Sequence, residues 1–222
     1  MIKQLIVLSI LFTSEVHTMA RSSLKTYRKR RELKKSSIYE PYGRIKKSES
    51  ALFVIQKHDA SHLHYDLRLE IDGVLKSWAV PKGMPEKVDI KRLAIPTDDH
   101  PYEYAHFEGI IPQGHYGGGT VMVWDIGSYQ NIKTKNNELV PMSECYDEGR
   151  IEVIFNGKKI QGPFALVRTK SLYAKNAWLL IKMRAIPGAK PKSAKKKVRK
   201  DVSALSGRTM NQITRDHDAE WD

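Results

Sequence analysis

The chain has 222 residues, of which 41% are hydrophobic, and its 38 basic and 25 acidic side chains give a formal net charge of +13. That size is enough for one sizeable core with tails, and so large a positive charge predicts a polyanionic partner, either nucleic acid or an anionic membrane surface. The single cysteine, Cys145, excludes an internal disulfide framework and a cysteine-based zinc site, so we expect it to be a small structural residue.

The first residues allow two interpretations. A lysine followed by the short apolar run Leu5–Phe12 is typical of a secretory signal, and the run is too short to span a bilayer. Alternatively, Met19 is the true start and residues 1–18 are an upstream extension. We favour Met19, because the chemistry described below is more typical of an intracellular protein. The expected location is therefore the cytoplasm, whereas a true signal over residues 1–20 would make the protein secreted or periplasmic.

The positive charge is concentrated in two arms. Residues 21–35 carry eight basic side chains and one acidic one, and residues 182–200 carry nine basic side chains and no acidic one. Together the arms hold +16, which leaves −3 for the rest of the chain. Basic tails can serve solubility alone, but both arms have the same sign and flank one compact region. We therefore predict contact with nucleic acid and no stable membrane association.

Between the arms, the hydrophobic pattern changes to a period of two. Short apolar segments predict strands at Leu52–Ile55, His62–Ile71, Val74–Val80, Lys91–Ile95, Thr120–Ile126, Arg150–Phe155, Phe164–Arg168 and Ala177–Met183. Asp72-Gly73 predicts a type I′ hairpin turn, and Asn156-Gly157 predicts a second tight turn. Many short strands with no long amphipathic helix among them predict a mainly β fold, either an antiparallel β-barrel or a sandwich.

The two ends of the chain are expected to differ from this β-rich middle. Lys25–Lys35 predicts a basic helix, residues 185–200 are rich in Pro, Ala and Lys and predict a disordered linker, and Ser203–Ile213 predicts a short helix. Trp221 is expected to dock back on the barrel. The resulting division is a signal-like segment or upstream extension (1–18), a basic N-terminal arm (19–50), a β-barrel domain (51–184), and a basic linker with a C-terminal tail (185–222).

One predicted strand carries a row of polar side chains. His62, His64, Asp66, Arg68 and Glu70 alternate with apolar residues, so they share one face of the strand. Such a row is often only the solvent face. Here His64 and Asp66 offer a mixed ligand set for Mn²⁺, Zn²⁺ or Fe²⁺, and His58 can supply a third ligand. Arg68 beside them offers a planar fork for phosphate oxygens, so the row also suits phosphoryl hydrolysis.

Two further stretches bear on the chemistry. Asp98–Tyr104 places an imidazole, His100, and a phenol, Tyr104, four residues apart in a turn-like segment. His115–Gly119 is glycine-rich and predicts a flexible rim, but it lacks the Gly-Lys-Ser/Thr ending of a phosphate-binding P-loop. The chain has no Gly-x-Ser-x-Gly elbow, which disfavours a serine hydrolase.

Longer motifs resemble a known family. The segments Gln56–Glu70, Leu75–Gly83, Asp99–Tyr104 and Phe107–Gly117 resemble the 3′-phosphoesterase domain of the bacterial non-homologous end-joining DNA ligase D, and Leu205–Met210 is similar to the tail of that group. The resemblance covers about residues 25–184. Because ligase and polymerase motifs are missing from the chain, we expect a free-standing version of this domain.

The resemblance implies a fold, an activity and a set of site residues. It implies a small antiparallel β-barrel and a Mn²⁺-dependent phosphoesterase, with Co²⁺ or Zn²⁺ as alternative metals, that removes 3′-phosphates and 3′-terminal ribonucleosides to leave a 3′-OH in DNA double-strand break repair. Its implied metal ligands are His58, His64 and Asp66, and its implied phosphate-binding and catalytic residues are Arg68, His100, Tyr104 and Lys82. The substrates would be DNA 3′ ends, including a primer–template with a terminal ribonucleotide. A separate DNA ligase or polymerase of the end-joining system would be a partner.

The N-terminal arm departs from the family pattern. Arg31 and Glu32 stand where the family has Arg-Asp, and Glu40 would supply the later acid. By resemblance, these substrate-binding positions support handling of the ribose end. We predict that Glu32→Asp raises ribonucleoside removal more than 3′-phosphate removal. The reason is that the longer side chain of Glu32 is expected to suit the ribose end less well than aspartate does. Rates on two primers, one ending in a ribonucleotide and one in a 3′-phosphate, check this prediction, and equal effects on both would contradict it.

Two other functions remain open at this point. The first is a non-catalytic DNA-end-binding module whose barrel has lost turnover, although every mapped position holds the expected residue type. The second is a secreted nuclease, which the first eighteen residues would favour.

Overall fold

A computed structural model of the protein describes residues 24, 51–169, 176–184 and 199–221. The expected signal or extension (1–18) and the N-terminal arm (19–50) with its predicted helix, apart from residue 24, lie outside the described residues. So does almost all of the predicted linker at 185–200. Among the described residues, the structure contains no helix that is long and apolar enough to cross a bilayer.

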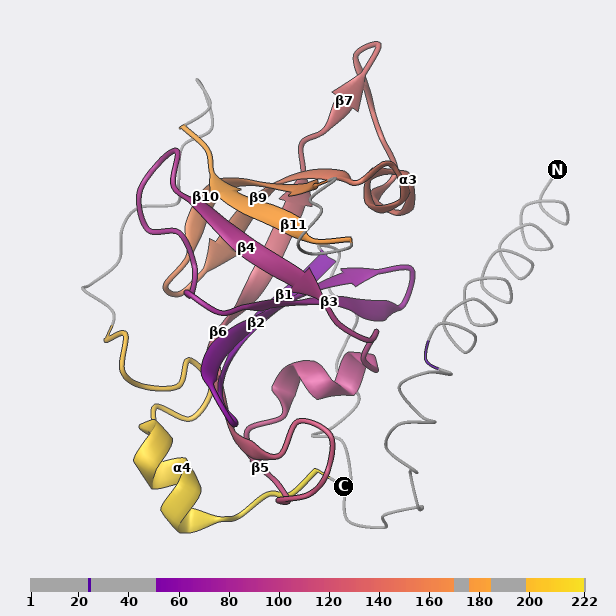
Figure 1. The fold of residues 1–222 in the computed structure, drawn as a ribbon. Helices are drawn as coiled ribbons and strands as arrows, with labels where there is room; N and C mark the ends of the chain where they lie inside the picture. Colours follow the sequence, from indigo (N-terminus) through magenta and orange to yellow (C-terminus); the bar gives the residue numbers. More distant parts are fainter. Residues whose placement is uncertain (1–23, 25–50, 170–175, 185–198, 222) are drawn as a thin grey trace, which may run out of the picture.

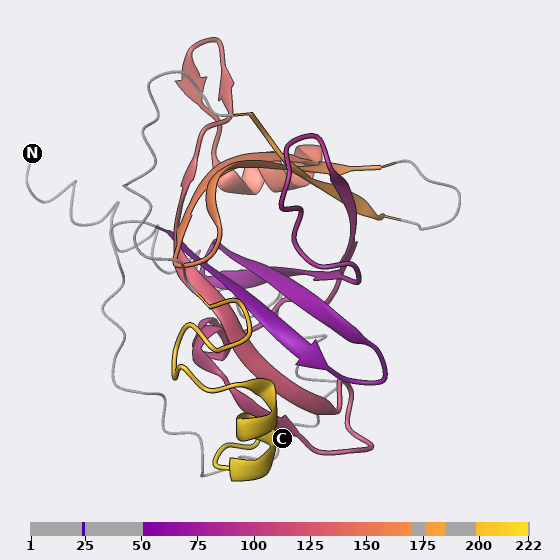
Figure 2. The ribbon, with the colours of Figure 1, turned by 90° about the vertical axis from the view of Figure 1, so that its left-hand side faces the viewer.

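Eight antiparallel strands close into a barrel (Figures 1 and 2). They are β1 (Ala51–Asp59), β2 (Leu63–Ile71), β3 (Val74–Val80), β4 (Lys91–Pro96), β6 (Gly119–Asn131), β9 (Arg150–Gly157), β10 (Gln161–Arg168) and β11 (Trp178–Lys182). Their order is β1-β2-β3-β4-β11-β10-β9-β6, and pairing of β1 with β6 closes the ring. The predicted mainly β fold is confirmed, and closure decides for a barrel over a sandwich.

Shorter elements decorate the barrel. They are the 3₁₀ helix η1 (Tyr102–His106), β5 (Gly109–Ile111), β7 (Thr134–Lys135), β8 (Glu138–Leu139), α3 (Met142–Glu148) and α4 (Met210–Asp216). β5 pairs with β6 outside the ring, and β7 and β8 form a separate hairpin. The predicted helix at Ser203–Ile213 is wrong in its bounds. Thr209 forms a capping box with Gln212, so α4 begins at Met210 and the preceding residues stay extended or turned.

Both predicted hairpins form, and the first of them turns at the predicted residues. Asp72 and Gly73 have φ of 52° and 79°, as a type I′ turn requires. The second hairpin, predicted at Asn156-Gly157, does join β9 to β10, but its turn comes later. Both residues still belong to β9, where Asn156 pairs with Gln161 of β10 and Gly157 pairs with Gly127 of β6. The chain turns over residues 158–160 instead. Buried Asp125 of β6 accepts their three backbone N–H groups at 2.7–3.0 Å, a long-range contact that local turn signals do not contain.

Aromatic rings fill the barrel. Phe53 packs on Phe155 with ring centroids 4.5 Å apart, and Trp78 meets Trp178 edge-on at 5.5 Å. Tyr146 of α3 packs against both of these tryptophans, so α3 contributes to the same core. Its neighbour Cys145 is a buried free thiol, as expected for a structural cysteine.

A second apolar cluster is distinct from the first. It consists of Val54, Leu75, Tyr104, Ala105, Phe107, Ile111, Val121, Val123 and Trp221. Because side chains alternate along β1, Phe53 and Ile55 join the first cluster while Val54 joins the second. η1, β5 and Trp221 therefore cover strand faces that would otherwise meet water. The docking of Trp221 that the sequence predicted is confirmed, since the residue is 8% exposed and packs on Tyr104.

The packing of η1, β5 and Trp221 on these strands also buries part of the polar row on β2. Asp66 and Arg68 are 6% and 2% exposed. The interpretation of the row as an ordinary solvent face is therefore wrong at these two positions. A charged pair in such a place needs partners, and the partners define the candidate site.

Candidate metal centre

Three potential metal ligands converge at one end of β1 and β2. His58 and His64 are directly opposite each other in the β1–β2 ladder, and Asp66 follows on the same face of β2. Nδ1 of His58 and Nε2 of His64 each lie 3.6 Å from a carboxylate oxygen of Asp66. The three ligand atoms all lie within 4.8 Å of one another, so the group could hold a metal ion. The strand register therefore brings His58 next to His64 and Asp66, although His58 is six residues from His64 in the sequence.

Hydrogen bonds to backbone carbonyl oxygens set the orientation of both imidazole rings. Nε2 of His58 is 2.9 Å from the carbonyl oxygen of Gly117, and Nδ1 of His64 is 2.8 Å from the carbonyl oxygen of His62. A carbonyl only accepts, so each of these nitrogens carries the proton. The opposite nitrogens, which face Asp66, then present lone pairs. Two lone pairs around a carboxylate form an electron-rich set that suits a cation, and this outer hydrogen bonding is typical of metal-binding histidines.

Asp66 is held in its charged form. Burial raises the pKa of its carboxyl, but the positive charge of the neighbouring Arg68 guanidinium lowers that pKa well below its usual range. Nη2 of Arg68 donates to Asp66 Oδ2 at 3.1 Å. Arg68 is therefore the direct link between the three ligands and the neighbouring pocket.

The guanidinium of Arg68 is fixed by directional contacts. Nε donates to Gln56 Oε1 at 2.7 Å, and the amide of Gln56 donates in turn to the main-chain carbonyls of Tyr104 and Phe107, each at 3.0 Å. Cζ of Arg68 also lies 4.8 Å from the centroid of the Tyr104 ring. These contacts keep a cation in one orientation beside the metal ligands, as recognition of an anionic group requires.

His100 completes this pocket. Its Nδ1 lies 2.9 Å from Arg68 Nη1 and 2.7 Å from the carbonyl oxygen of Asp98. The guanidinium needs a lone pair on Nδ1, whereas the carbonyl needs a proton there, so a neutral ring satisfies one of them at a time. Two backbone hydrogen bonds with Leu75 of β3 anchor the residue, and its ring packs 4.8 Å from Tyr104.

The remaining predicted residues fall into two groups. Lys82 is exposed two residues beyond β3, and Val80 at the end of that strand pairs with Tyr65, the neighbour of His64. Lys82 therefore follows the end of β3 that lies beside the ligand strand, and it takes no part in the hydrogen bonds described above. The other group, Arg31, Glu32 and Glu40, lies outside the described residues.

Two positioning groups were not predicted from the sequence. Gln56 looked like an ordinary polar residue in a strand, although its position two residues before His58 on the same strand was a usable signal. The second group is the backbone carbonyl of Gly117 in the glycine-rich rim, which orients His58. Gly119 has φ of 144°, and a Cβ there would lie 2.2 Å from the Asp59 carbonyl oxygen, so glycine is what lets this loop approach β1.

Together, fold and site define a small antiparallel barrel with a His₂Asp cluster and an adjoining arginine–histidine pocket. Lone pairs suited to a cation lie beside a fixed guanidinium. This arrangement can bind an anion such as a phosphate ester next to a metal ion.

Comparisons with known proteins agree with this class. The family described as the DNA ligase D 3′-phosphoesterase domain matches residues 56–168. The "Multifunctional non-homologous end joining protein LigD" of Pseudomonas aeruginosa is 40% identical over 196 residues, which are 84% of this chain and 22% of that protein. The protein of the same description from Mycolicibacterium smegmatis is 44% identical over 168 residues, 76% of this chain and 21% of the relative.

The chain belongs to the DNA ligase D 3′-phosphoesterase domain family. A third relative, the "Multifunctional non-homologous end joining DNA repair protein LigD" of Mycobacterium tuberculosis, is 40% identical over 161 residues, 72% of this chain and 20% of the relative. The chain thus spans about a fifth of the length of the curated relatives it matches.

Proposed function

We propose that the protein is a metal-dependent 3′-phosphoesterase that removes 3′-phosphates and 3′-terminal ribonucleosides from DNA ends and leaves a 3′-OH during double-strand break repair. The observation that carries the proposal is the contact between Arg68 and Asp66 at 3.1 Å, which joins the three metal ligands to the anion pocket. Family membership supports the reaction class. A separate DNA ligase or polymerase of end joining would use the product.

The proposed metal is Mn²⁺, with Co²⁺ or Zn²⁺ as alternatives. His58, His64 and Asp66 would hold it, since two imidazole nitrogens and a carboxylate suit these ions. When bound, such an ion polarises a phosphoryl oxygen and makes hydroxide available at neutral pH.

The residues of the chain perform the other tasks. Arg68 binds the oxygens of the scissile phosphate and balances the charge that develops on them, because its guanidinium is already oriented by Gln56. His100 lies beside that guanidinium and supplies a proton to the oxygen that leaves phosphorus, or stabilises its charge. Tyr104 supports both groups through its ring, and Lys82 adds positive charge at the rim.

The test is end trimming on a labelled primer–template whose primer ends in a ribonucleotide 3′-phosphate. With Mn²⁺ we expect conversion to a 3′-OH by the wild-type protein. With EDTA, or with the His64→Ala variant in Mn²⁺, we expect no conversion above background, because the ligand set is empty or incomplete. Gel mobility of the primer, followed by ligation to a 5′-phosphate strand, measures the product.

The neighbouring exposed imidazole provides a matched control. His62→Ala removes an imidazole two residues from His64 and keeps the His62 carbonyl that orients it, so its rate should match the wild-type rate. Tight binding of the same duplex with no conversion under Mn²⁺, Co²⁺ or Zn²⁺ would replace the proposal with the non-catalytic end-binding module. The secreted nuclease and the cytoplasmic location remain predictions, which mapping of the start codon and fractionation would separate.

A further inference from the structure

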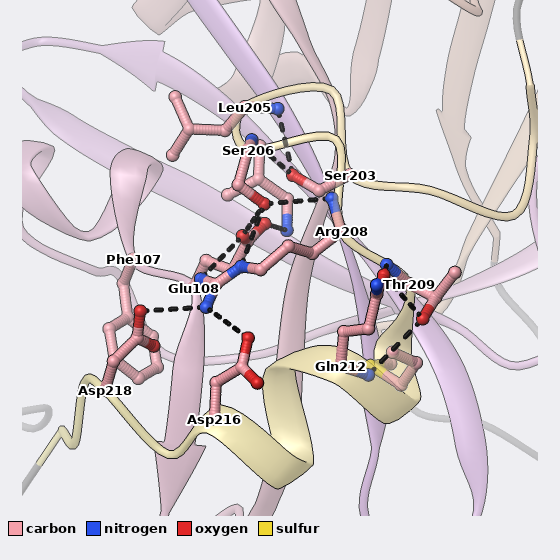
Figure 3. Close-up of polar contacts among 12 residues, drawn as sticks. Phe107, Glu108, Ser203, Leu205, Ser206, Arg208, Thr209, Gln212, Asp216 and Asp218 are labelled. Atoms are coloured by element: carbon pink, nitrogen blue, oxygen red, sulfur yellow. Dashed lines mark hydrogen bonds and ion pairs between the residues drawn. The ribbon is translucent and has the colours of Figure 1, made fainter.

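One buried carboxylate fastens the C-terminal segment, Ser203–Trp221, to the barrel. Glu108, next to β5, is 6% exposed and accepts hydrogen bonds from the Val123 backbone N–H at 3.2 Å, from the Ser206 hydroxyl and from Arg208 at 3.2 Å (Figure 3). Because a buried carboxylate is costly without donors, loss of the segment would leave Glu108 poorly satisfied. The segment and the barrel are thus one packed unit at this point.

Arg208 extends this fastening to the far end of the segment. Its Nη1 pairs with Asp216, the last residue of α4, at 3.4 Å, and with Asp218, just beyond the helix, at 2.8 Å (Figure 3). One guanidinium therefore ties the barrel carboxylate to the residues that lead into the chain terminus. The last residues are held in a defined direction, toward β5.

Backbone pairing then carries the chain across β5. The N–H of Ile110 donates to the Ala219 carbonyl at 2.9 Å, and the N–H of Trp221 donates to the Ile110 carbonyl at 3.0 Å. This approach needs Gly109, because a Cβ there would lie 2.2 Å from the Ala219 carbonyl oxygen. A substitution at Gly109 therefore displaces the end of the segment without touching a side chain of the candidate site.

The segment ends with Trp221 against the rings that support the anion pocket. Its indole meets Tyr104 edge-on, with centroids 4.8 Å apart and planes at 80°, and it lies 5.3 Å from Phe107. The carbonyls of these same two residues hold Gln56, which holds Arg68. A continuous chain of contacts thus runs from Trp221 to the guanidinium.

We propose that Trp221 is a positioning residue for the anion pocket and acts through Tyr104 and Phe107 on Gln56 and Arg68. The kinetic consequence rests on the phosphoesterase function proposed above. Edge-on aromatic packing prefers one geometry, so the indole limits how far η1, which carries Tyr104, can move. The C-terminal segment is on this account a support of the site and not an independent tail.

The test compares Trp221→Ala, Trp221→Phe and Gly109→Ala with the wild-type protein in Mn²⁺. We expect kcat on a primer–template with a 3′-phosphate to fall about 10- to 100-fold in Trp221→Ala and Gly109→Ala, since a displacement of about 1 Å is enough for such a loss, while KM changes less. Trp221→Phe keeps a ring against Tyr104 and should retain most of the rate. Exchange of the Arg68 Nε proton with water, followed by NMR, should become faster in the two impaired variants.

Controls separate positioning from folding. Asn211→Ala changes an exposed residue of α4 and should match the wild-type protein, and melting temperatures exclude global unfolding. Wild-type kinetics and wild-type Nε exchange in both Trp221→Ala and Gly109→Ala would overturn the positioning role. If the wild-type protein itself shows no turnover, the proposed function fails. The exchange measurement alone then decides this inference, with faster exchange in both variants supporting it and unchanged exchange refuting it.

Discussion

Arg68→Lys is expected to lower kcat for 3′-phosphate removal by about a thousandfold or more, within the range of losses when a transition-state arginine is removed. Three different nitrogens of Arg68 contact Gln56, Asp66 and His100 at 2.7, 3.1 and 2.9 Å. A lysine keeps the positive charge but has one nitrogen, so it cannot satisfy these partners and also face a phosphate. The loss should therefore appear although the net charge of the site is unchanged.

Single-turnover rates in saturating Mn²⁺ measure this effect, with the melting temperature of each variant recorded alongside. Arg150→Lys is the matched control, because Arg150 is exposed and pairs with Glu152 on the barrel surface. A stable Arg68→Lys variant with a rate within tenfold of wild type would show that charge alone suffices. The proposal that the oriented guanidinium of Arg68 is needed to bind the scissile phosphate would then be wrong.

Asp125→Ala is expected to lower the free energy of unfolding by about 3 kcal/mol, since several backbone N–H groups would lose a charged acceptor. The carboxylate is fully buried and accepts from Ile126, Lys158, Lys159 and Ile160 at 2.7–3.0 Å. It thereby replaces the hydrogen bonds that a regular tight turn would make for itself between β9 and β10. Asp125→Asn should fall between the wild type and the alanine variant, because only one of its two terminal atoms accepts.

Urea unfolding followed by tryptophan fluorescence measures this stability. Asp147→Ala removes an exposed carboxylate of α3 and should change the free energy of unfolding by less than about 0.5 kcal/mol. A loss below about 1 kcal/mol in Asp125→Ala would mean that water replaces the carboxylate in the turn. The hydrogen bonds from residues 158–160 to Asp125 would then contribute little to stability.

Most of the strands could be predicted because their signals are local. The period-two pattern identified eight strands and one hairpin turn correctly, since the alternation and the Asp72-Gly73 pair depend on neighbouring residues alone. The pairing of His64 with Asp66 on one strand face followed from the same alternation. The turn of the second hairpin was predicted at Asn156-Gly157 and not at residues 158–160, because its stabilising acceptor, Asp125, lies on another strand.

Alternation along the chain was enough to put His64, Asp66 and Arg68 on one face of a strand, and their chemistry was enough to indicate metal and phosphate. Only the tertiary structure decided that His58 faces His64 across a ladder, that Gln56 orients Arg68, and that η1 and Trp221 cover this face. The physical reason is the distance along the sequence over which each interaction acts. Alternation and turn preference act between adjacent residues, whereas strand register, burial of a charge and the approach of a distant chain end depend on how the whole barrel closes.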